Sequence, residues 1–325
     1  MKAIVLEEYG GVEVLKDKEI QTPKPAKEEL LINVKATALN RADILQRKGF
    51  YPGPPAQHEI PGLEFAGTVS ASGNGAALYQ KGDPVMGIVA GGAYAEFLTV
   101  HEKQVIPIPQ NISFTEAAGI PEAWFTAYDA LIDKGNLVTG DTCLIHAGAS
   151  GVGTAAIQIA KSIGAEVATT ASTKKIDTCL QLGADLAIDY TKGDFVKEIL
   201  EWTNNQGVNV IIDLVGGEYL AKNLQSVSSQ GRIIQVGLMG LGKPEIDLGI
   251  LLRKRISLIG TVLRTRSQKE KIELTKKITD FVIPKFTTGE FRILIDSIKQ
   301  FSEIADAHTR MERNQNIGKI IVEIS

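Results

Sequence analysis

The chain has 325 residues, of which 44% are hydrophobic and 22% are charged, and its formal net charge is −3. This ordinary globular composition excludes a disordered chain, a collagen and a coiled coil, and the length favours two domains over one. With 35 basic and 38 acidic residues, the chain has no basic excess that would indicate a nucleic-acid-binding protein.

The cellular setting is predicted from the cysteines and the apolar runs. Two cysteines, Cys143 and Cys179, exclude a disulfide framework. The apolar runs are too short for a membrane helix. The apolar run at the start ends at Glu7 and Glu8, so it is too short for the apolar region of a signal peptide. We therefore expect a cytoplasmic protein without a membrane partner.

The first third of the chain is predicted to be rich in strands. Short apolar runs alternate with turns that contain proline and glycine, such as Pro61-Gly62. The runs are Lys2 to Leu6, Glu29 to Ala36, Gly62 to Val69 and Asp83 to Val89. Short strands with frequent turns are typical of a small barrel or sandwich.

From Ser113 the pattern changes to helices, and then to strands and helices in alternation. Ser113 and Glu116 form a capping box that predicts a helix from Thr115 to Ile120, and a second helix is expected from about Trp124 to Leu131. Strands are predicted at 144–146, 166–170, 186–189, 208–214, 232–236, 257–262 and 319–324, and helices at 154–163, 174–182, 195–202, 268–281 and 304–311. Such a series predicts an α/β fold with a doubly wound parallel sheet.

A glycine-rich turn joins the first of these later strands to its helix. The segment Gly148-Ala149-Ser150-Gly151-Val152-Gly153 matches the first and third glycines of the dinucleotide fingerprint, with Ser150 in the second place. The glycines allow a tight turn and close packing, and N–H groups at the helix start hold the pyrophosphate. A glycine-rich turn can be purely structural, but the strand and helix around it favour a dinucleotide site.

The next strand indicates which dinucleotide is bound. An NAD site usually has an acid about 20 residues further on, which binds the ribose 2′-hydroxyl. Here the strand ends in Ser172-Thr173-Lys174-Lys175, without an acid. A hydroxyl and two lysines suit a 2′-phosphate, so NADPH is predicted. The alternative is a solvated helix start, although lysines there oppose the helix dipole.

Several segments resemble one enzyme family. They are Ala38-Leu39-Asn40-Arg41-Ala42-Asp43, Ile60-Pro61-Gly62-Leu63-Glu64-Phe65-Ala66-Gly67, Ile120-Pro121-Glu122-Ala123-Trp124, His146-Ala147-Gly148-Ala149-Ser150-Gly151-Val152-Gly153 and Asn316-Ile317-Gly318-Lys319-Ile320. Over nearly the whole chain, they resemble the zinc-free quinone oxidoreductase (zeta-crystallin-like) branch of the medium-chain dehydrogenases/reductases. The likeness is greatest to members that a tumour suppressor induces in animals.

The resemblance implies a GroES-like β-barrel domain and a Rossmann domain. Residues 1–122 and 266–325 are expected to form the GroES-like catalytic and substrate domain, and residues 123–265 the Rossmann NADPH-binding domain. The active site is expected in the cleft between them. The resemblance also implies a homodimer or a tetramer of dimers.

No metal is expected. The zinc-dependent branch has a cysteine in place of Asn40 and a histidine in place of Leu63, besides a lobe with four cysteines. Zinc needs a tetrahedral set of nitrogen or sulfur ligands, and the two cysteines and four histidines of this chain are scattered. Glu64 stands at a position near the metal of that branch, but one carboxylate is not a metal site.

Three residues are candidates for the chemistry. Hydride transfer to a quinone or enone puts negative charge on an oxygen, which a neutral donor stabilises. Tyr51 can donate its phenol proton or only pack over the nicotinamide. Asn40 can hold the nicotinamide ribose or a substrate oxygen, or cap a loop. Ser150 can reach the substrate or the pyrophosphate, or serve only the turn.

The resemblance implies further cofactor contacts. Besides Asn40, the turn residues Gly148 to Gly153, Ser172 and Lys175, these are Thr126 beside the nicotinamide, Tyr190 near the 2′-phosphate, Val215 and Gly216 on the adenosine side, then Gly237, Leu238, Met239, Leu263, Arg264 and Asn316. Each can also be an ordinary loop residue.

The predicted function is metal-free, NADPH-dependent reduction of quinones, in particular ortho-quinones. The alternatives are an NADPH-dependent reductase of alkenal or enone C=C bonds, and an NADPH-binding redox sensor without catalysis. A single-electron route to a semiquinone would need no general acid, which fits the lack of an evident Ser-His, Cys-His or paired-carboxylate constellation in the sequence.

Overall fold

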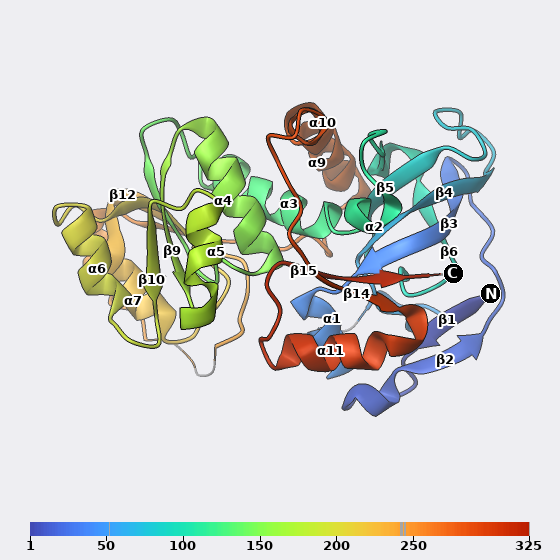
Figure 1. Cartoon of the computed structure of the whole chain (residues 1–325), viewed down its shortest axis with the longest axis horizontal. Helices are drawn as coiled ribbons and strands as arrows, with labels where there is room; N and C mark the ends of the chain where they lie inside the picture. Colours follow the sequence, from blue (N-terminus) through green and yellow to red (C-terminus); the bar gives the residue numbers. More distant parts are fainter. Residues whose placement is uncertain (52, 241–242, 244, 325) are drawn as a thin grey trace. The chain divides into compact units, whose positions relative to one another are not determined.

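A computed structural model describes residues 1–51, 53–240, 243 and 245–324 (Figure 1). The chain divides into two compact units. Unit 1 comprises Met1–Phe125 and Arg264–Ser325, and unit 2 comprises Thr126–Leu263. The predicted domain boundaries after residues 122 and 265 lie close to these divisions. The units are described separately below.

Unit 1 contains a seven-stranded sheet in the order β14-β15-β3-β4-β5-β7, with β6 also paired to β3. Its strands are β3 (Glu29–Ala38), β4 (Glu64–Ser72), β5 (Pro84–Ile88), β6 (Phe97–His101), β7 (Val105–Pro107), β14 (Ile295–Gln300) and β15 (Lys319–Glu323). Alternate residues of β3 are buried, because one face of the strand packs on the core. β1 (Lys2–Val5) and β2 (Lys16–Glu19) form a separate antiparallel pair.

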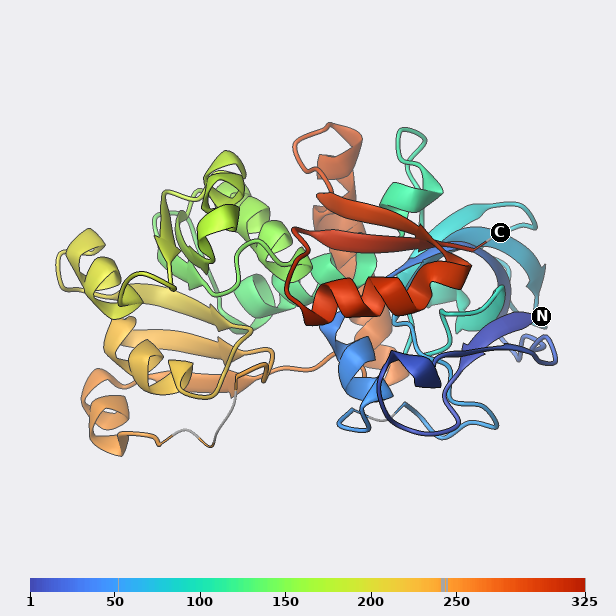
Figure 2. The same ribbon diagram turned by 60° about the horizontal axis from the view of Figure 1, so that its bottom comes forward.

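The return of the chain to unit 1 completes this sheet. β15 pairs antiparallel with β3, so that Ile321 lies opposite Ala38. Figure 2 shows α11 (Ile304–Glu312) lying along β14 and β15. Its buried residues Ile304 and Met311 pack with Ile320 in one core cluster. The last segment is therefore part of the core of unit 1.

The other helices of unit 1 begin at the start signals of the sequence. They are α1 (Arg41–Arg47), α2 (Phe114–Ala117), α9 (Gln268–Phe281), α10 (Ile283–Thr287) and the first part of α3 (Pro121–Tyr128). The hydroxyl oxygen of Ser113 accepts a hydrogen bond from the Glu116 N–H and caps α2. α3 begins with Pro121, whose ring suits the first helical position.

Unit 2 contains a six-stranded parallel sheet in the order β10-β9-β8-β11-β12-β13. The strands are β8 (Thr142–Ile145), β9 (Glu166–Ala171), β10 (Leu186–Asp189), β11 (Val208–Asp213), β12 (Val227–Gln235) and β13 (Ser257–Gly260). The helices are α4 (Gly151–Ile163), α5 (Ile176–Gln181), α6 (Phe195–Trp202), α7 (Tyr219–Ser226) and α8 (Leu248–Lys254), and a π-helix (Asp129–Lys134) extends α3. This is the doubly wound order with its switch point between β8 and β11.

The strand register explains the core of unit 2. Leu144 of β8 lies opposite Ala168 of β9 and Ile211 of β11, so these side chains share one face of the sheet. They pack with Ile199 of α6 and Leu224 of α7 in one buried cluster. Parallel strands are buried on both faces, which is why their sequences are almost continuously apolar.

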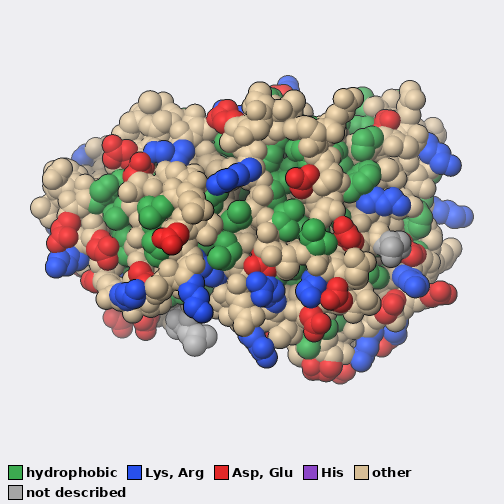
Figure 3. All heavy atoms as spheres, viewed as in Figure 1, with side chains coloured by type: hydrophobic (Ala, Val, Ile, Leu, Met, Phe, Trp, Pro, Cys, Tyr) green, Lys and Arg blue, Asp and Glu red, His purple; other side chains and the backbone are tan. Residues whose placement is uncertain are grey.

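The predicted α/β fold class is confirmed, and most predicted elements exist with small shifts of their ends. The helix expected from Thr115 to Ile120 ends at Ala117, because Pro121 starts a new helix shortly afterwards. The elements that were not predicted are α1, α7, α8, α10, β2, β6, β7 and β14. Charged side chains of both signs are interspersed on the face in Figure 3. Among the described residues, no helix is long and apolar enough to cross a membrane.

Candidate functional site

The turn after β8 is shaped for close approach to a ligand. A side chain at Gly148 would bring its Cβ to 1.8 Å from the hydroxyl oxygen of Thr169, and one at Gly153 would come to 2.4 Å from the carbonyl oxygen of Ala147. Ala147 itself has a φ of 53°. The backbone is thus held in a conformation that admits no Cβ at either fingerprint glycine.

Ser150 caps the start of α4, and two backbone N–H groups of the first turn remain available for a ligand. Its hydroxyl oxygen accepts a hydrogen bond of 3.0 Å from the Gly153 N–H, so Ser150 is the N-cap. No partner for the Gly151 or Val152 N–H occurs among the described residues, and both residues are partly exposed. Free N–H groups at a helix start bind anions, so this turn fits a pyrophosphate.

The other predicted residues of unit 2 follow the carboxyl ends of its strands. Because the sheet is parallel, these ends lie along one edge, where ligands of such sheets bind. They are Ser172 after β9, Tyr190 after β10, Val215 and Gly216 after β11, Gly237, Leu238 and Met239 after β12, and Leu263 after β13. Thr126 lies in α3 and is 8% exposed.

The loops at this edge are held by a hydrogen-bonded chain that was not predicted. One Asp213 oxygen accepts from the N–H groups of Val215 and Gly216, each at 2.7 Å, and the other accepts from the Asn223 amide at 2.9 Å. The Asn223 oxygen is 2.7 Å from Nε2 of His146, whose pKa burial lowers. His146 is therefore neutral, and its Nδ1 contacts Thr170 at 3.0 Å.

The edge also contains a carboxylate that was not predicted, Asp189. Thr173 donates its hydroxyl to Asp189 of β10 at 2.5 Å, and Thr191 donates to the same carboxylate. These hydrogen bonds hold the pKa of Asp189 well below its usual range. The preference for NADPH was predicted from the residues that follow β9 alone. The neighbouring strand, β10, places Asp189 beside Thr173. Ser172 is half-buried and makes no side-chain cap to the short helix Thr173–Lys175.

Unit 1 contains a buried polar cluster around Asn40. The Asn40 amide nitrogen donates to Glu64 at 2.7 Å, and its oxygen accepts from the ammonium group of Lys319 at 2.8 Å. Lys319 also donates to Glu64 at 2.6 Å and to the carbonyl oxygen of Leu39 at 3.1 Å. The orientation of the Asn40 amide is therefore fixed from both sides.

A second part of the cluster starts at Asp43. Its carboxylate accepts hydrogen bonds from the backbone N–H groups of Asn40, at 2.7 Å, and Gly62, at 3.2 Å, and from the Tyr94 hydroxyl at 3.1 Å. Burial raises the pKa of Asp43 to about 6. The Tyr94 hydroxyl lies 3.3 Å from Nε2 of His308, and burial lowers the pKa of that histidine to about 3. Hydrogen bonds of Asp43 thus link α1 to the loop before β4 and, through Tyr94 and His308, to α11.

Tyr51 and Arg264, two predicted residues, are in contact. The Arg264 guanidinium lies 4.3 Å from the centre of the Tyr51 ring and donates to the Tyr51 carbonyl oxygen at 2.8 Å. It also donates to Gln46 at 2.5 Å. Burial raises the pKa of Tyr51, so the phenol keeps its proton at neutral pH. Asn316, the last predicted residue, is buried in the turn before β15, where its amide donates to the carbonyl oxygen of Gly318 at 2.9 Å.

Glu122 was not predicted as a site residue. Its backbone N–H donates to the second oxygen of Glu64 at 2.8 Å. Burial and the negative charge of Glu64 raise the pKa of Glu122 to about 8, so its carboxyl group is protonated at neutral pH. Glu64, Asp43, Glu122 and Lys319 come from distant parts of the sequence, and each alone resembles an ordinary charged residue. Glu122 lies within the segment Ile120–Trp124 that carries the family resemblance, and this was the one signal that could have indicated it.

A metal does not fit the Asn40 position. The Lys319 ammonium group already occupies the side of Glu64 that faces Asn40, and a second cation there would be repelled. Leu63, at the other zinc position, offers no ligand atom. Throughout residues 1–51, 53–240, 243 and 245–324, no three His, Cys, Asp or Glu side chains are grouped to hold a metal ion.

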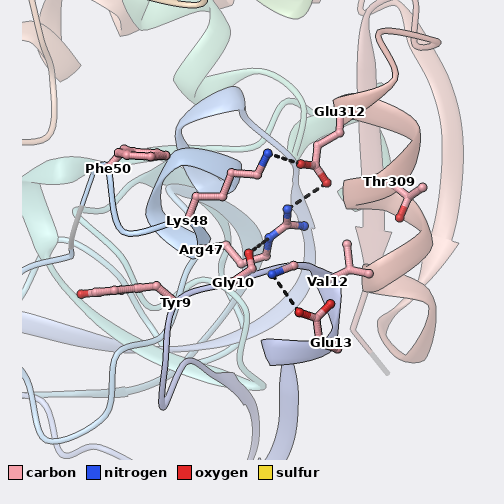
Figure 4. Close-up of a pocket in the computed structure, with 10 residues that line it drawn as sticks. Tyr9, Gly10, Val12, Glu13, Arg47, Lys48, Phe50, Thr309 and Glu312 are labelled. Carbon is pink, nitrogen blue, oxygen red and sulfur yellow. Dashed lines mark hydrogen bonds and ion pairs between the residues drawn. The ribbon is translucent and has the colours of Figure 1, made fainter.

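A pocket of about 580 Å³ lies elsewhere in unit 1 (Figure 4). Tyr9, Phe50 and the ion pairs of Glu312 line it. Glu312 is 2.8 Å from the buried guanidinium of Arg47 and 2.6 Å from Lys48. None of the predicted site residues lines this pocket. Its two cations, Arg47 and Lys48, are paired with Glu312.

Comparison with known proteins identifies the family. Residues 151–280 match the zinc-binding dehydrogenase family, and residues 26–110 match the alcohol dehydrogenase GroES-like domain. The human quinone oxidoreductase is 30% identical over 326 residues, covering 99% of this chain and 97% of that protein. The human synaptic vesicle membrane protein VAT-1 homolog is also 30% identical, over 99% of this chain and 86% of that protein.

A solved structure agrees with these relatives. The Escherichia coli quinone oxidoreductase complexed with NADPH superimposes with a TM-score of 0.92 at 27% identity, over the full length of both chains. The fold is therefore one that binds a nicotinamide dinucleotide, and the expected pairing of a Rossmann sheet with a GroES-like domain is confirmed. The chain belongs to the medium-chain dehydrogenase/reductase family of oxidoreductases and lies close to its quinone oxidoreductases.

Proposed function

We propose that the chain is a metal-free, NADPH-dependent reductase of quinones, with ortho-quinones as the preferred class. The observation that carries the proposal is the turn after β8, which excludes a Cβ at Gly148 and Gly153 and leaves the N–H groups of Gly151 and Val152 for an anion. The likeness to quinone oxidoreductases supports the choice of substrate.

A bound nicotinamide dinucleotide supplies hydride, and the chain positions it. In this proposal, residues 148–153 hold the pyrophosphate, and the Val215-Gly216 and Gly237-Leu238-Met239 loops hold the adenosine side. The Asp213 carboxylate supports this by fixing the Val215 and Gly216 N–H groups. Thr126, Leu263, Arg264 and Asn316 complete the proposed contacts.

The preference for NADPH over NADH rests on Ser172, Lys175 and Tyr190. Tyr190 is 47% exposed and lies at the carboxyl end of β10, next in the sheet to the strand that precedes Ser172. A hydroxyl and an ammonium group there suit a 2′-phosphate. The ionised Asp189 opposes a second negative charge, but it is engaged by Thr173, Thr191 and Lys192.

Replacement of Lys175 by alanine tests this preference. We expect the dissociation constant for NADPH to rise about tenfold while that for NADH changes little, because only NADPH has the 2′-phosphate. The matched control is Lys197→Ala, since Lys197 is exposed and pairs loosely with Glu201. Equal losses for the two dinucleotides in titrations of the purified chain would contradict the assignment.

Two residues of unit 1 are proposed to act on the substrate. The Tyr51 phenol is protonated, so it can donate a hydrogen bond to a developing oxyanion. Asn40 is less free than the sequence suggested, because its nitrogen and oxygen are both engaged. We therefore assign Asn40 to accept a hydroxyl hydrogen through its remaining lone pair, either from the ribose or from a substrate.

The reaction itself is tested by following the loss of reduced nicotinamide absorbance. NADPH and NADH are compared with 1,2-naphthoquinone, and then with a 2-alkenal, in the presence of EDTA. Fast loss with NADPH and the quinone supports the proposal. Loss only with the alkenal would indicate the C=C reductase, and tight NADPH binding without turnover of either substrate would indicate the redox sensor.

Association into a homodimer, or a tetramer of dimers, is part of the proposal. β13 is an edge strand of the described sheet in unit 2, and its Leu258 is 37% exposed. An unpaired strand edge with apolar side chains favours pairing with another strand. Light scattering of the purified chain and of Leu258→Lys tests this. A cytoplasmic setting is also proposed, because Cys143 and Cys179 are buried free thiols.

A further inference from the structure

The carboxyl group of Glu122 has no evident structural role. Glu122 is the second residue of α3, and only its backbone N–H is used, in the bond to Glu64. Its side chain has no hydrogen-bond partner among the described residues and is only partly buried. A carboxyl group at a helix start normally binds the free N–H groups of the first turn. Here the Glu64 carboxylate has taken that place.

The groups around Glu122 favour the protonated form of its carboxyl group. The Glu64 carboxylate is 2.6 Å from the Lys319 ammonium group and also accepts the backbone N–H of Glu122. Two carboxylates that share a site do not both ionise readily. The charged and titratable groups that act on Glu122 are Glu64 of β4, Asp43 of α1, Lys319 of β15, Arg264, Tyr51 and Lys271 of α9. The two acids and burial outweigh the cations, so the neutral form persists at pH 7.

The position of Glu122 connects it to both proposed reaction partners. It interacts electrostatically with Tyr51, the proposed hydrogen-bond donor to the substrate oxygen. In α3 it precedes Thr126, the proposed neighbour of the nicotinamide, by four residues, so the two side chains lie on the same helix face.

We propose that Glu122 is the proton donor of the reductase, an inference that rests on the proposed function. Reduction of a quinone by a hydride adds two electrons and one proton, and leaves an oxyanion that needs a second proton. In that step the O–H bond of the Glu122 carboxyl group breaks and the O–H bond of the hydroquinone forms, directly or through the Tyr51 hydroxyl. The resulting carboxylate regains a proton from solvent water through its exposed side.

The test compares Glu122→Gln, Glu122→Asp and the control Glu273→Gln, whose carboxylate is exposed in α9. Glutamine has the same shape as the protonated acid, so the fold should survive. We expect Glu122→Gln to lower kcat for the quinone about 100-fold, with little change in KM or in NADPH binding. In the wild type, kcat should fall as the pH rises through about 8, and this limb should be absent in Glu122→Gln. Glu122→Asp should restore part of the rate and the pH limb.

A second readout uses the cofactor-free protein. Infrared difference spectra between wild type and Glu122→Gln should show the carbonyl band of a protonated carboxylic acid at pH 7, which disappears near pH 8. Absence of that band at pH 7, or an unchanged kcat and pH profile in Glu122→Gln, would overturn the inference while leaving the proposed function intact. If the wild type reduces neither the quinone nor the alkenal, the proposed function fails and the donor role falls with it, whatever the infrared band shows.

Discussion

The two polar regions of this molecule are built in opposite ways. The turn after β8 in unit 2 offers backbone N–H groups and space, and its fingerprint residues are uncharged. The cluster around Glu64 in unit 1 is made of charged side chains, with Glu64 and Lys319 at most 4% exposed. The first region is local in sequence, whereas the second joins residues up to 280 positions apart. A backbone site depends on the space that glycine leaves, and a charged cluster depends on every partner being present.

The largest effect is expected from Lys319→Met, which removes the cation of the charged cluster. Glu64 would then be buried without its counter-charge, and the Asn40 oxygen would lose its donor. We expect a loss of about 3–5 kcal/mol in the free energy of unfolding, measured in urea.

The double variant Lys319→Met/Glu64→Gln sharpens this prediction. It removes both charges, so a large part of the lost stability should return. If the double variant is no more stable than Lys319→Met alone, Lys319 and Glu64 do not act as an ion pair. The cluster in unit 1 would then not depend on paired charges, as the comparison with the turn after β8 assumes.

A smaller effect is expected from Gly148→Ala, which fills the space in the turn. The new Cβ would overlap the hydroxyl of Thr169, a buried β-branched residue that cannot move away easily. We expect a loss of about 1–3 kcal/mol in unfolding free energy and a clear loss of NADPH affinity in calorimetric titration. Gly260→Ala is the control, because its Cβ would meet nothing within 4 Å. Equal behaviour of the two variants would show that space at Gly148 is not required.

The smallest effect is a gain of stability in Glu122→Gln. An acid whose pKa rises on folding from 4.5 to about 8 destabilises the folded chain increasingly as the pH rises between those values, because the unfolded chain loses the proton first. Allowing for partial exposure, the variant should be about 1–2 kcal/mol more stable than wild type at pH 7 and equal to it near pH 4. Asp43, whose pKa rises from 3.8 to about 6, lowers the stability of both proteins equally as the pH rises between those two values. A constant difference between pH 4 and pH 8 in urea titrations would contradict this assignment.

The sequence predicted the parts of the site that depend on local spacing. Gly148, Ser150 and Gly153 are recognisable because strand, turn and helix follow each other within a few residues. Their exact ligand contacts remain predictions. Glu122, Asp43 and Lys319 escaped prediction because their roles arise from neighbours in other strands and helices. Asp189 escaped prediction for the same reason. NADPH was predicted from the end of β9, whereas β10, which carries Asp189, is its neighbour only in the folded sheet.

The position of Lys319 in the chain has a consequence for biosynthesis. β3, β4 and α1 are made early, but β15 follows only after the whole of unit 2 has left the ribosome. Until then, nascent unit 1 lacks the strand that pairs with β3 and the cation that compensates Glu64. During synthesis, the first part of unit 1 therefore stays incompletely folded, with Glu64 lacking its counter-charge. The sheet of unit 2 is continuous in sequence, so unit 2 can fold during translation.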